Sequence, residues 1–310
     1  MEMIFPQPLV PGAAIGIISP ATIVKPEYID GAADFLRARG YEPVISAHAK
    51  GPASGSYASG YEERLGDFLD MWRNPDIKAV LCARGGYGTA HLLPALSPQV
   101  LRDNAKWLIG FSDISALHAA LQTAGVASVH GPMAKHLTLC PDAFATEALL
   151  GILAGHEPDY AVAGHPLNHP GEASGTLIGG NLAVLNGLAG TPYDLLDSSR
   201  HDKVILFIED VSEKIYAVER MLWRLVMSGA LQRVAALIVG RFTDYTADRN
   251  FPDMERMIES LLQRAGISGI PVAYDFPVGH VDENYPMVEG AQVRLRVSAA
   301  DGVRLQFQRW

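Results

Sequence analysis

The feature that most constrains the fold is an alternation, in the first half of the chain, of short apolar runs with longer segments of helical spacing. The apolar runs occupy residues 13–19, 41–46, 77–83, 106–110 and 127–131. Helical spacing fills the gaps, for example from Pro26 to Arg39, where Gly40 ends the pattern. Ser59 and Glu62 predict a capping box before the next helix. Continuous apolar strands that alternate with helices are typical of a parallel sheet covered on both faces. We therefore expect an α/β fold with an N-terminal, doubly wound, mostly parallel sheet.

The chain of 310 residues is long enough for two domains. Residues 154–175 are rich in Gly, Pro and His and show no sustained periodicity, which is typical of a linker. The second half again mixes strand and helix patterns, with an apolar run at 203–210 before a helical segment near 215–228. We expect a nucleophile domain over residues 1–153, a linker over 154–175 and a C-terminal α/β domain over 176–310.

Composition excludes several classes of function. The formal net charge of −9 argues against nucleic acid or an anionic membrane as the main partner, because both favour basic surfaces. Two cysteines, Cys82 and Cys140, do not make a disulfide framework. No run approaches the ~18 apolar residues of a membrane helix. The first twenty residues lack a basic segment of the signal-peptide type. We expect a cytoplasmic protein.

Ser112 lies in the stretch GFSDI, between an apolar run and a segment of helical spacing. Serine is a common N-cap residue, so its role could be limited to helix capping. A sharp turn after a buried strand can also present a serine hydroxyl as a nucleophile, close to helix amides that bind an oxyanion. The hydrolase pattern G-x-S-x-G lacks its second glycine here, because Ile114 takes that place. The residues alone leave both interpretations open.

The stretch ARGGYG also follows an apolar run. Its glycines fit neither the G-x-G-x-x-G pattern nor a P-loop. Gly85, Gly86 and Gly88 could form a tight turn, or a nest of backbone amides that binds an anion. Arg84 could add a cation for a substrate carboxylate, or be solvated.

Two further polar groups follow apolar runs in the second half. Glu209 ends the run VILFIE, with Asp210 and Glu213 as competing carboxylates, and His280 follows the segment AYDFPVG. A serine nucleophile needs a base, and the base needs an acceptor that fixes its tautomer. Ser112, Glu209 and His280 each lie just past a predicted strand, where open α/β sheets place their sites. Together, in this order along the chain, Ser112, Glu209 and His280 are one candidate for a catalytic triad.

A metal centre is not expected. His280, Asp282 and Glu283 are close in sequence but lack a recognised ligand spacing, and no H-E-x-x-H motif occurs. The residues therefore favour a site without a metal.

Five ordered motifs together resemble the LD-carboxypeptidase family of serine peptidases. They are GFSDISALH, ARGGYG, GTLIGGNLAVLNGLAGTPYD, LFIEDVSEKIYAVERML and PVGHVDENYPMVEGAQVRL. The resemblance runs from about Ile15 to Leu295. It implies an N-terminal sheet domain like that of class I glutamine amidotransferases and a smaller C-terminal α/β domain. It also implies a Ser-Glu-His triad of Ser112, Glu209 and His280.

The resemblance further implies an oxyanion hole from the backbone amides of Gly86 and Asp113, no cofactor, a small peptide substrate and a homodimer. An exopeptidase must also bind a free carboxylate. Arg84 and the amide of Asn181 are the candidates for that contact.

The family contains two branches with different substrates. One removes the terminal D-alanine from murein tetrapeptides during cytoplasmic cell-wall recycling, and the other comprises microcin-immunity peptidases that cut peptidyl- or aminoacyl-nucleotide amides. The second branch tends to carry a longer insertion with an aromatic side chain for the nucleobase. This chain is compact there and has no tryptophan between Trp107 and Trp223, which favours the carboxypeptidase branch. A non-catalytic binder of a small molecule or nucleotide is the third alternative.

Overall fold

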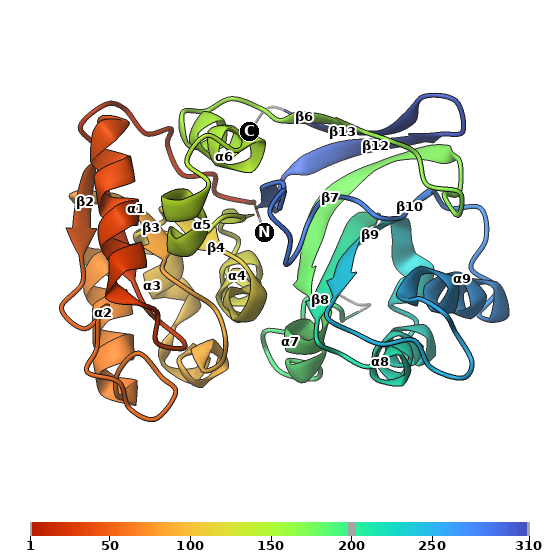
Figure 1. Cartoon of the computed structure of the whole chain (residues 1–310), viewed down its shortest axis with the longest axis horizontal. Coiled ribbons are helices and arrows are strands. Elements are labelled where there is room, and N and C mark those ends of the chain that lie inside the picture. Colours follow the sequence, from red (N-terminus) through yellow and green to blue (C-terminus); the bar gives the residue numbers. More distant parts are fainter. Residues whose placement is uncertain (1, 198–202, 309–310) are drawn as a thin grey trace. The chain divides into compact units, whose positions relative to one another are not determined.

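The computed structural model describes residues 2–197 and 203–308 and divides into two compact units (Figure 1). The first unit runs up to His156 and also contains Tyr285–Gly290. The second comprises Glu157–Asn284 and the chain from Ala291 onward. The polypeptide therefore leaves the first unit, builds most of the second, and returns to the first for one short segment.

The first unit is built on a six-stranded sheet in the order β11-β5-β4-β3-β1-β2. Its strands are β1 (Ala14–Ile18), β2 (Glu42–Ile45), β3 (Ile77–Cys82), β4 (Trp107–Gly110), β5 (Ser128–His130) and β11 (Met287–Glu289). The five strands β1 to β5 are parallel, and β11 pairs antiparallel with β5 at one edge. The expected α/β class and the mostly parallel N-terminal sheet are confirmed.

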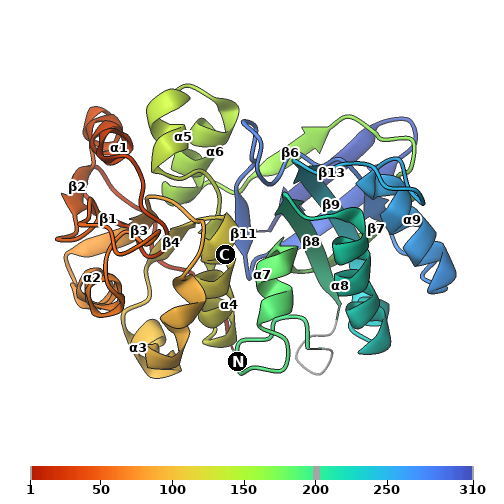
Figure 2. The ribbon, with the colours of Figure 1, turned by 60° about the horizontal axis from the view of Figure 1, so that its bottom comes forward.

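Helices cover both faces of this sheet, because its central strands are apolar on both sides. The helices are α1 (Pro26–Ala38), α2 (Tyr61–Arg73), α3 (Pro98–Asp103), α4 (Ser115–Thr123), α5 (Ala134–Leu139) and α6 (Phe144–Leu153). Figure 2 shows α1 and α5 on one face and α2, α3 and α4 on the other. The predicted capping box of α2 is displaced by one residue, since its N-cap is Gly60, whose N–H donates to the Glu63 carboxylate (2.7 Å).

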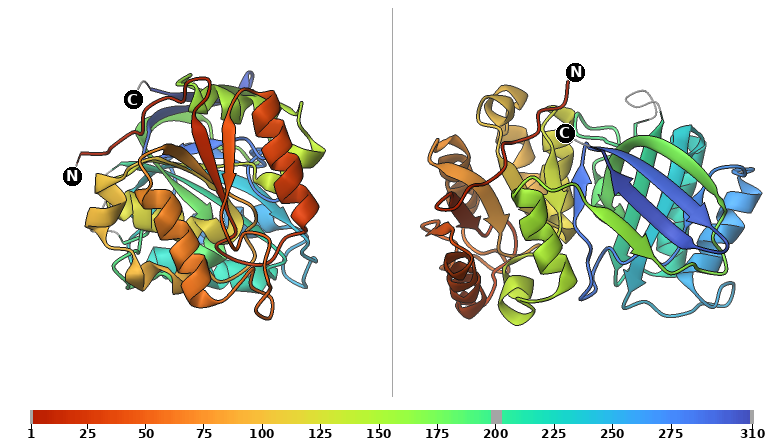
Figure 3. Two further views of the ribbon diagram at one scale, coloured as in Figure 1. Left: turned by 90° about the vertical axis from the view of Figure 1, so that its left-hand side faces the viewer. Right: turned by 90° about the horizontal axis from the view of Figure 1, so that it is seen from above.

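The second unit contains a seven-stranded sheet in the order β10-β9-β8-β7-β12-β13-β6. Its strands are β6 (Asp159–Val162), β7 (Gly171–Asn181), β8 (Val204–Val211), β9 (Val234–Thr243), β10 (Val272–Ala273), β12 (Gln292–Ser298) and β13 (Gly302–Phe307). The strands from β10 to β7 are parallel, whereas β12, β13 and β6 continue the sheet antiparallel. Helices α7 (Leu182–Gly187), α8 (Ile215–Met227) and α9 (Met254–Arg264) lie beside its parallel part (Figure 3).

Two segments differ from the sequence-based expectation. Much of the predicted linker over 154–175 belongs to the second sheet, because β6 pairs with β13 and the start of β7 pairs with β12. The predicted C-terminal domain also gives up Tyr285–Gly290 to the first unit. The strand β6 and the start of β7 have exposed polar residues, so they lack the apolar continuity that marks the central strands, whereas β11 is buried but only three residues long. Within the described residues, no helix has both the length and the apolar character needed to cross a bilayer.

Candidate active site

Ser112 lies in a strained turn at the carboxyl end of β4. A single 3-10 turn, Ser112–Ile114, joins β4 to α4. The φ angle of Ser112 is +66°, in the left-handed region that a side chain with a Cβ rarely adopts. The N-cap residues of the 3-10 turn and of α4 are Phe111 and Ile114, so Ser112 caps neither of them. Such strain persists only where the surroundings enforce it, and it is common at active sites.

The ARGGYG turn packs directly against this strained serine. A Cβ on Gly85 would lie 2.9 Å from the Ser112 Cβ and 3.1 Å from the Asp113 nitrogen. Real Cβ atoms do not approach that closely, so only glycine allows the two turns to be in contact. Close packing of these two turns therefore requires a glycine at position 85.

Arg84, Gly86 and Tyr87 are the exposed residues of the ARGGYG turn. Gly86, also at positive φ, is followed by Tyr87, whose backbone N–H donates to the Thr22 hydroxyl (3.0 Å). Arg84 is exposed and donates to the Ile23 carbonyl (2.9 Å). The backbone of the turn is therefore held in place, while the Arg84 guanidinium is exposed to solvent.

The second unit brings Glu209 and His280 together. Glu209 lies near the carboxyl end of β8 and is fully buried. The His280 Nδ1 lies 2.8 Å from the Glu209 Oε2. A carboxylate fixes the imidazole with hydrogen on Nδ1, which makes Nε2 the basic nitrogen of the ring. Serine hydrolases hold their base and its orienting carboxylate in this arrangement.

A glycine allows that pair to form. Gly279 has φ +126°, and a Cβ there would lie 2.9 Å from the Glu209 Cβ and 3.0 Å from its Oε2. The Gly279 N–H donates to the side-chain oxygen of the buried Asn284 (2.9 Å), which holds the turn. The Gly-His dipeptide carries little information in the sequence, but its glycine is a steric requirement for this contact.

Electrostatics raise the pKa of His280. Burial of the ring lowers its pKa, but the hydrogen bond to Glu209 and the charges of Glu209, Asp210 and Asp244 outweigh that effect. The net pKa lies above the ordinary histidine value. The imidazolium that forms when His280 takes a proton is therefore stabilised.

Asp210, a competing carboxylate in the sequence, has a different set of partners. It accepts hydrogen bonds from the Asn181 side chain (2.9 Å) and from the Ala183 N–H (2.8 Å) at the start of α7. Burial, followed by the nearby Glu209 charge, raises the pKa of Asp210 to about 6. Asn181 is the N-cap of α7 and accepts from the Val184 N–H (3.1 Å). Asp210 and Asn181 thus anchor α7, and Glu209 contacts the histidine.

Comparison with known proteins identifies the family. The family model of the LD-carboxypeptidase N-terminal domain matches residues 15–131, and that of the LD-carboxypeptidase C-terminal domain matches residues 174–295. The chain belongs to the LD-carboxypeptidase family. The resemblance inferred from the five motifs is confirmed, and the protein is an enzyme of the serine carboxypeptidase class.

Relatives and solved structures agree over nearly the whole length of this LD-carboxypeptidase. The murein tetrapeptide carboxypeptidase of Pseudomonas aeruginosa is 32% identical, covering 94% of this chain and 94% of its own. The crystal structure of muramoyltetrapeptide carboxypeptidase from Oxalobacter formigenes is 31% identical with a TM-score of 0.85, covering 96% of this chain and 99% of its own. MccF in complex with glutamyl sulfamoyl guanosine has a TM-score of 0.86 at 21% identity, with 98% of both chains covered. This last similarity shows a common fold.

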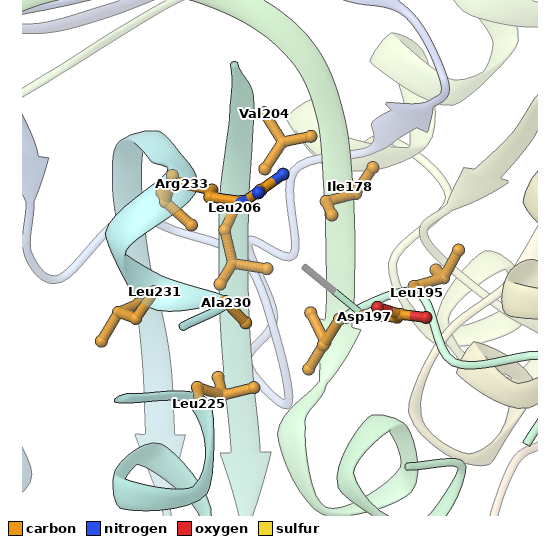
Figure 4. A pocket seen from close by; sticks show the side chains of 11 residues that line it. Ile178, Leu195, Asp197, Val204, Leu206, Leu225, Ala230, Leu231 and Arg233 are labelled. Carbon is orange, nitrogen blue, oxygen red and sulfur yellow. The ribbon is translucent and has the colours of Figure 1, made fainter. Parts of the chain in front are cut away.

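The pockets of the individual units lie away from the predicted catalytic groups. An apolar pocket in the second unit is lined by residues such as Ile178, Leu206 and Leu225 (Figure 4). Its accessible volume of ≈ 20 Å³ is room for about one water molecule, too little for a peptide. A hollow of ≈ 750 Å³ in the first unit lies at the amino ends of β1, β3 and β4, opposite the end that carries Ser112.

A neutral buried network lies at the base of the nucleophile turn. The His118 Nε2 lies 2.9 Å from the Gly110 carbonyl and its Nδ1 2.8 Å from the Ser128 hydroxyl. A carbonyl only accepts, so the hydrogen-bond network assigns the proton to Nε2. Burial lowers the pKa of His118 to about 4 and raises the pKa of Glu289 well above its usual value. His118 is neutral near pH 7, so its 4.0 Å approach to Glu289 is not an ion pair.

Several residues around the site were not predicted from the sequence. They are Thr22, Thr89, His118, Asn284, Glu289 and the side chain of Asp113. Thr22, Thr89 and Asp113 act through contacts with residues far away in the chain, for which local sequence contains little signal. The one available hint was Glu289, since a carboxylate inside the apolar stretch PMVEGA requires a buried partner or a neutral form.

Proposed function

We propose that this LD-carboxypeptidase releases the terminal D-alanine from murein tetrapeptides, with Ser112, His280 and Glu209 as its triad. The hydrogen bond between His280 and Glu209, which orients the imidazole with hydrogen on Nδ1 so that Nε2 can act as the base, is the observation that carries the proposal. The strained Ser112 turn supports it, because a nucleophile elbow has this geometry. The family resemblance further leads us to propose a homodimer that acts in cytoplasmic cell-wall recycling.

The reaction proceeds by acyl transfer. The His280 Nε2 takes the Ser112 hydroxyl proton while Oγ bonds to the carbonyl carbon that precedes D-alanine. His280 then gives this proton to the leaving amine, and the C–N bond breaks. Water attacks the resulting ester, with His280 again as the base, which frees the shortened peptide and restores Ser112. Glu209 stabilises the imidazolium in both steps.

The backbone amides of Gly86 and Asp113 are the proposed oxyanion donors. The contact between Gly85 and the Asp113 nitrogen supports this assignment, because it brings the two turns that carry these amides together within one unit. Each such donor typically contributes about 10²–10³ in rate.

The proposal requires Ser112 and His280, which belong to different units, to meet, and the chain between His280 and β11 limits how far apart they can be. Met287, the first residue of β11, lies seven residues after His280, and a chain spans at most about 3.3–3.6 Å per residue. This connection keeps the His280 backbone within roughly 25 Å of β11. In the first sheet β11 is separated from β4, the strand before Ser112, by β5 alone.

Recognition of the terminal carboxylate falls to Arg84 in this proposal. Its guanidinium is exposed, on the turn that carries the Gly86 amide. Asn181, the other candidate, is buried and already bonds to Asp210 and to the first turn of α7. Arg84→Gln should therefore raise KM for a free tetrapeptide and leave a C-terminally amidated peptide unaffected.

A paired assay tests the proposed substrate. The protein is mixed with a murein tetrapeptide and, separately, with an aminoacyl sulfamoyl-adenosine, and the products are separated by mass. We expect free D-alanine from the first mixture and none from the Ser112→Ala variant. Cleavage of the nucleotide conjugate alone would assign the microcin-immunity activity, and turnover by neither mixture would favour a non-catalytic binder.

A further inference from the structure

The two turns that carry the proposed oxyanion donors are joined by one pair of side chains. Thr89 begins the short helix after the ARGGYG turn, three residues beyond Gly86, and Asp113 directly follows Ser112. The Asp113 Oδ2 accepts from the Thr89 N–H at 2.9 Å and lies 2.7 Å from the Thr89 hydroxyl oxygen. That hydroxyl is also 2.5 Å from the Asp113 main-chain oxygen. Both residues are buried.

We propose that Thr89 is a positioning residue that aligns the Gly86 and Asp113 amides through these hydrogen bonds, here called the Thr89 clamp. The inference rests on the proposed function, because the alignment of these two amides matters only if they bind the oxyanion of the reaction. Thr89 itself touches no reacting atom. It acts through Asp113, whose side chain and main-chain oxygen both lie within reach of its hydroxyl.

The geometry explains why such a clamp is needed. The Ser112 backbone is strained, and a strained turn relaxes unless its neighbours hold it. Gly85 packs against the Ser112 turn, and this packing sets a minimum distance between the two turns. The hydrogen bonds between Thr89 and Asp113, the residue next to Ser112, are attractive contacts that hold the turns together. A small error in donor placement strongly reduces oxyanion stabilisation.

A second anchor fixes the other side of the clamp. The buried Arg64 guanidinium donates to the Gly88 carbonyl (3.0 Å) and to the Pro20 carbonyl (2.8 Å). Thr89 is therefore attached to a turn that is itself held in place. A fixed turn can transmit position to Asp113, whereas a loose one could not.

The Thr89→Val variant tests the clamp, because it replaces the hydroxyl by a methyl group of similar size and keeps the N–H. We expect kcat to fall about tenfold or more, below the about 10²–10³ lost with a whole donor, with KM within about twofold of wild type. Thr89→Ser restores the hydroxyl and should recover most of kcat. The affinity for a peptidyl boronic acid, whose tetrahedral adduct occupies the oxyanion hole, should fall by the same factor as kcat/KM.

Thr146→Val is the matched control. Thr146 is also fully buried, and its hydroxyl donates to a main-chain carbonyl, that of Cys140 (2.9 Å), in a helix that carries none of the proposed catalytic groups. This variant should lower Tm by a similar amount and leave kcat and boronic acid affinity unchanged. If Thr89→Val does not fold, Thr89→Ala is measured in the same way.

Each outcome separates this inference from the proposed function. A Ser112→Ala variant with wild-type turnover would overturn both. An inactive Ser112→Ala together with wild-type kcat and boronic acid affinity in Thr89→Val would overturn the clamp alone. Loss of kcat in Thr89→Val that Thr89→Ser fails to recover would also overturn it, because the hydroxyl would then not be the cause.

Discussion

The two units hold their proposed catalytic side chains by opposite physical means. Around Ser112, steric contact with the ARGGYG turn and hydrogen bonds to neutral groups such as His118 fix a strained backbone. Around His280, a buried carboxylate and two further acidic residues set both the orientation and the pKa of the ring. The proposed nucleophile is therefore held by steric contacts, and the proposed base is held by interactions with charged groups.

This difference indicates which unit responds to pH. The neutral groups around Ser112 keep their geometry when the pH changes. His280 lies beside carboxylates and changes its charge as it titrates. The pH dependence of activity should follow the charge of His280. The maximum rate should depend on how well packing holds the Ser112 turn.

The largest expected effect contrasts the two histidines. His280→Ala should reduce kcat on the order of 10⁴ or more, because no group remains to take the serine proton. His118→Gln, which can still donate to the Gly110 carbonyl, should keep kcat within about tenfold. Steady-state kinetics with a murein tetrapeptide measure both. Equal losses of kcat in the two variants would contradict the assignment of His280 as the base and His118 as a structural residue.

The second prediction separates the two adjacent carboxylates. Glu209→Gln should fold well and lose about 10³–10⁴ in kcat, because the amide no longer stabilises the imidazolium. Asp210→Asn should lose about tenfold or less, since Asp210 bonds to the start of α7. Circular dichroism verifies folding before rates are compared. A larger loss in Asp210→Asn would move the acid role to that residue.

The third prediction concerns the acid limb of kcat/KM. The base must be neutral, so activity is lost as pH falls through the raised pKa of His280. The limb should therefore lie above the ordinary histidine value. In Glu209→Gln the hydrogen bond and charge that raise this pKa are gone, burial dominates, and the limb should move to lower pH. In His118→Gln the limb should not move, because the pKa of His118 is about 4.

The smallest effect is on stability rather than rate. Burial raises the pKa of Glu289, so its neutral form is retained in the folded state while the unfolded chain ionises. Folding is then disfavoured progressively as pH rises above the ordinary Glu value, by up to about 1.4 kcal/mol per pH unit until the folded pKa is reached. Glu289→Gln removes this dependence. The difference in Tm between variant and wild type should be larger at pH 8 than at pH 5.

The sequence was most informative where one strand or one turn decides the structure. The continuous apolar runs predicted β1, β3 and β4 correctly because a buried parallel strand needs no alternation. The same reasoning selected Ser112, Glu209 and His280 as candidates for the triad, since each stands at the end of an apolar run or just past it. The contact between Glu209 and His280 was only a hypothesis there, because 71 residues separate them.

Other parts of the structure depend on contacts that local sequence does not encode. β11 has three residues, too few to show a periodicity, and it forms because it pairs with the edge of β5. The strands within 157–175 are polar on their outer side, which made them look like a linker. Thr89 and Asp113 are 24 residues apart and meet because two turns at the end of one sheet pack together.

The antiparallel strand β11 has a consequence for dissection of the protein. A fragment that stops at His156 would contain every helix of the first unit but would lose the neighbour of β5 and the side chain that Gln122 bonds. The exposed edge would be free to recruit strands from other molecules. Expression of this half alone should give aggregates, whereas co-expression with the remaining chain should restore a complete sheet.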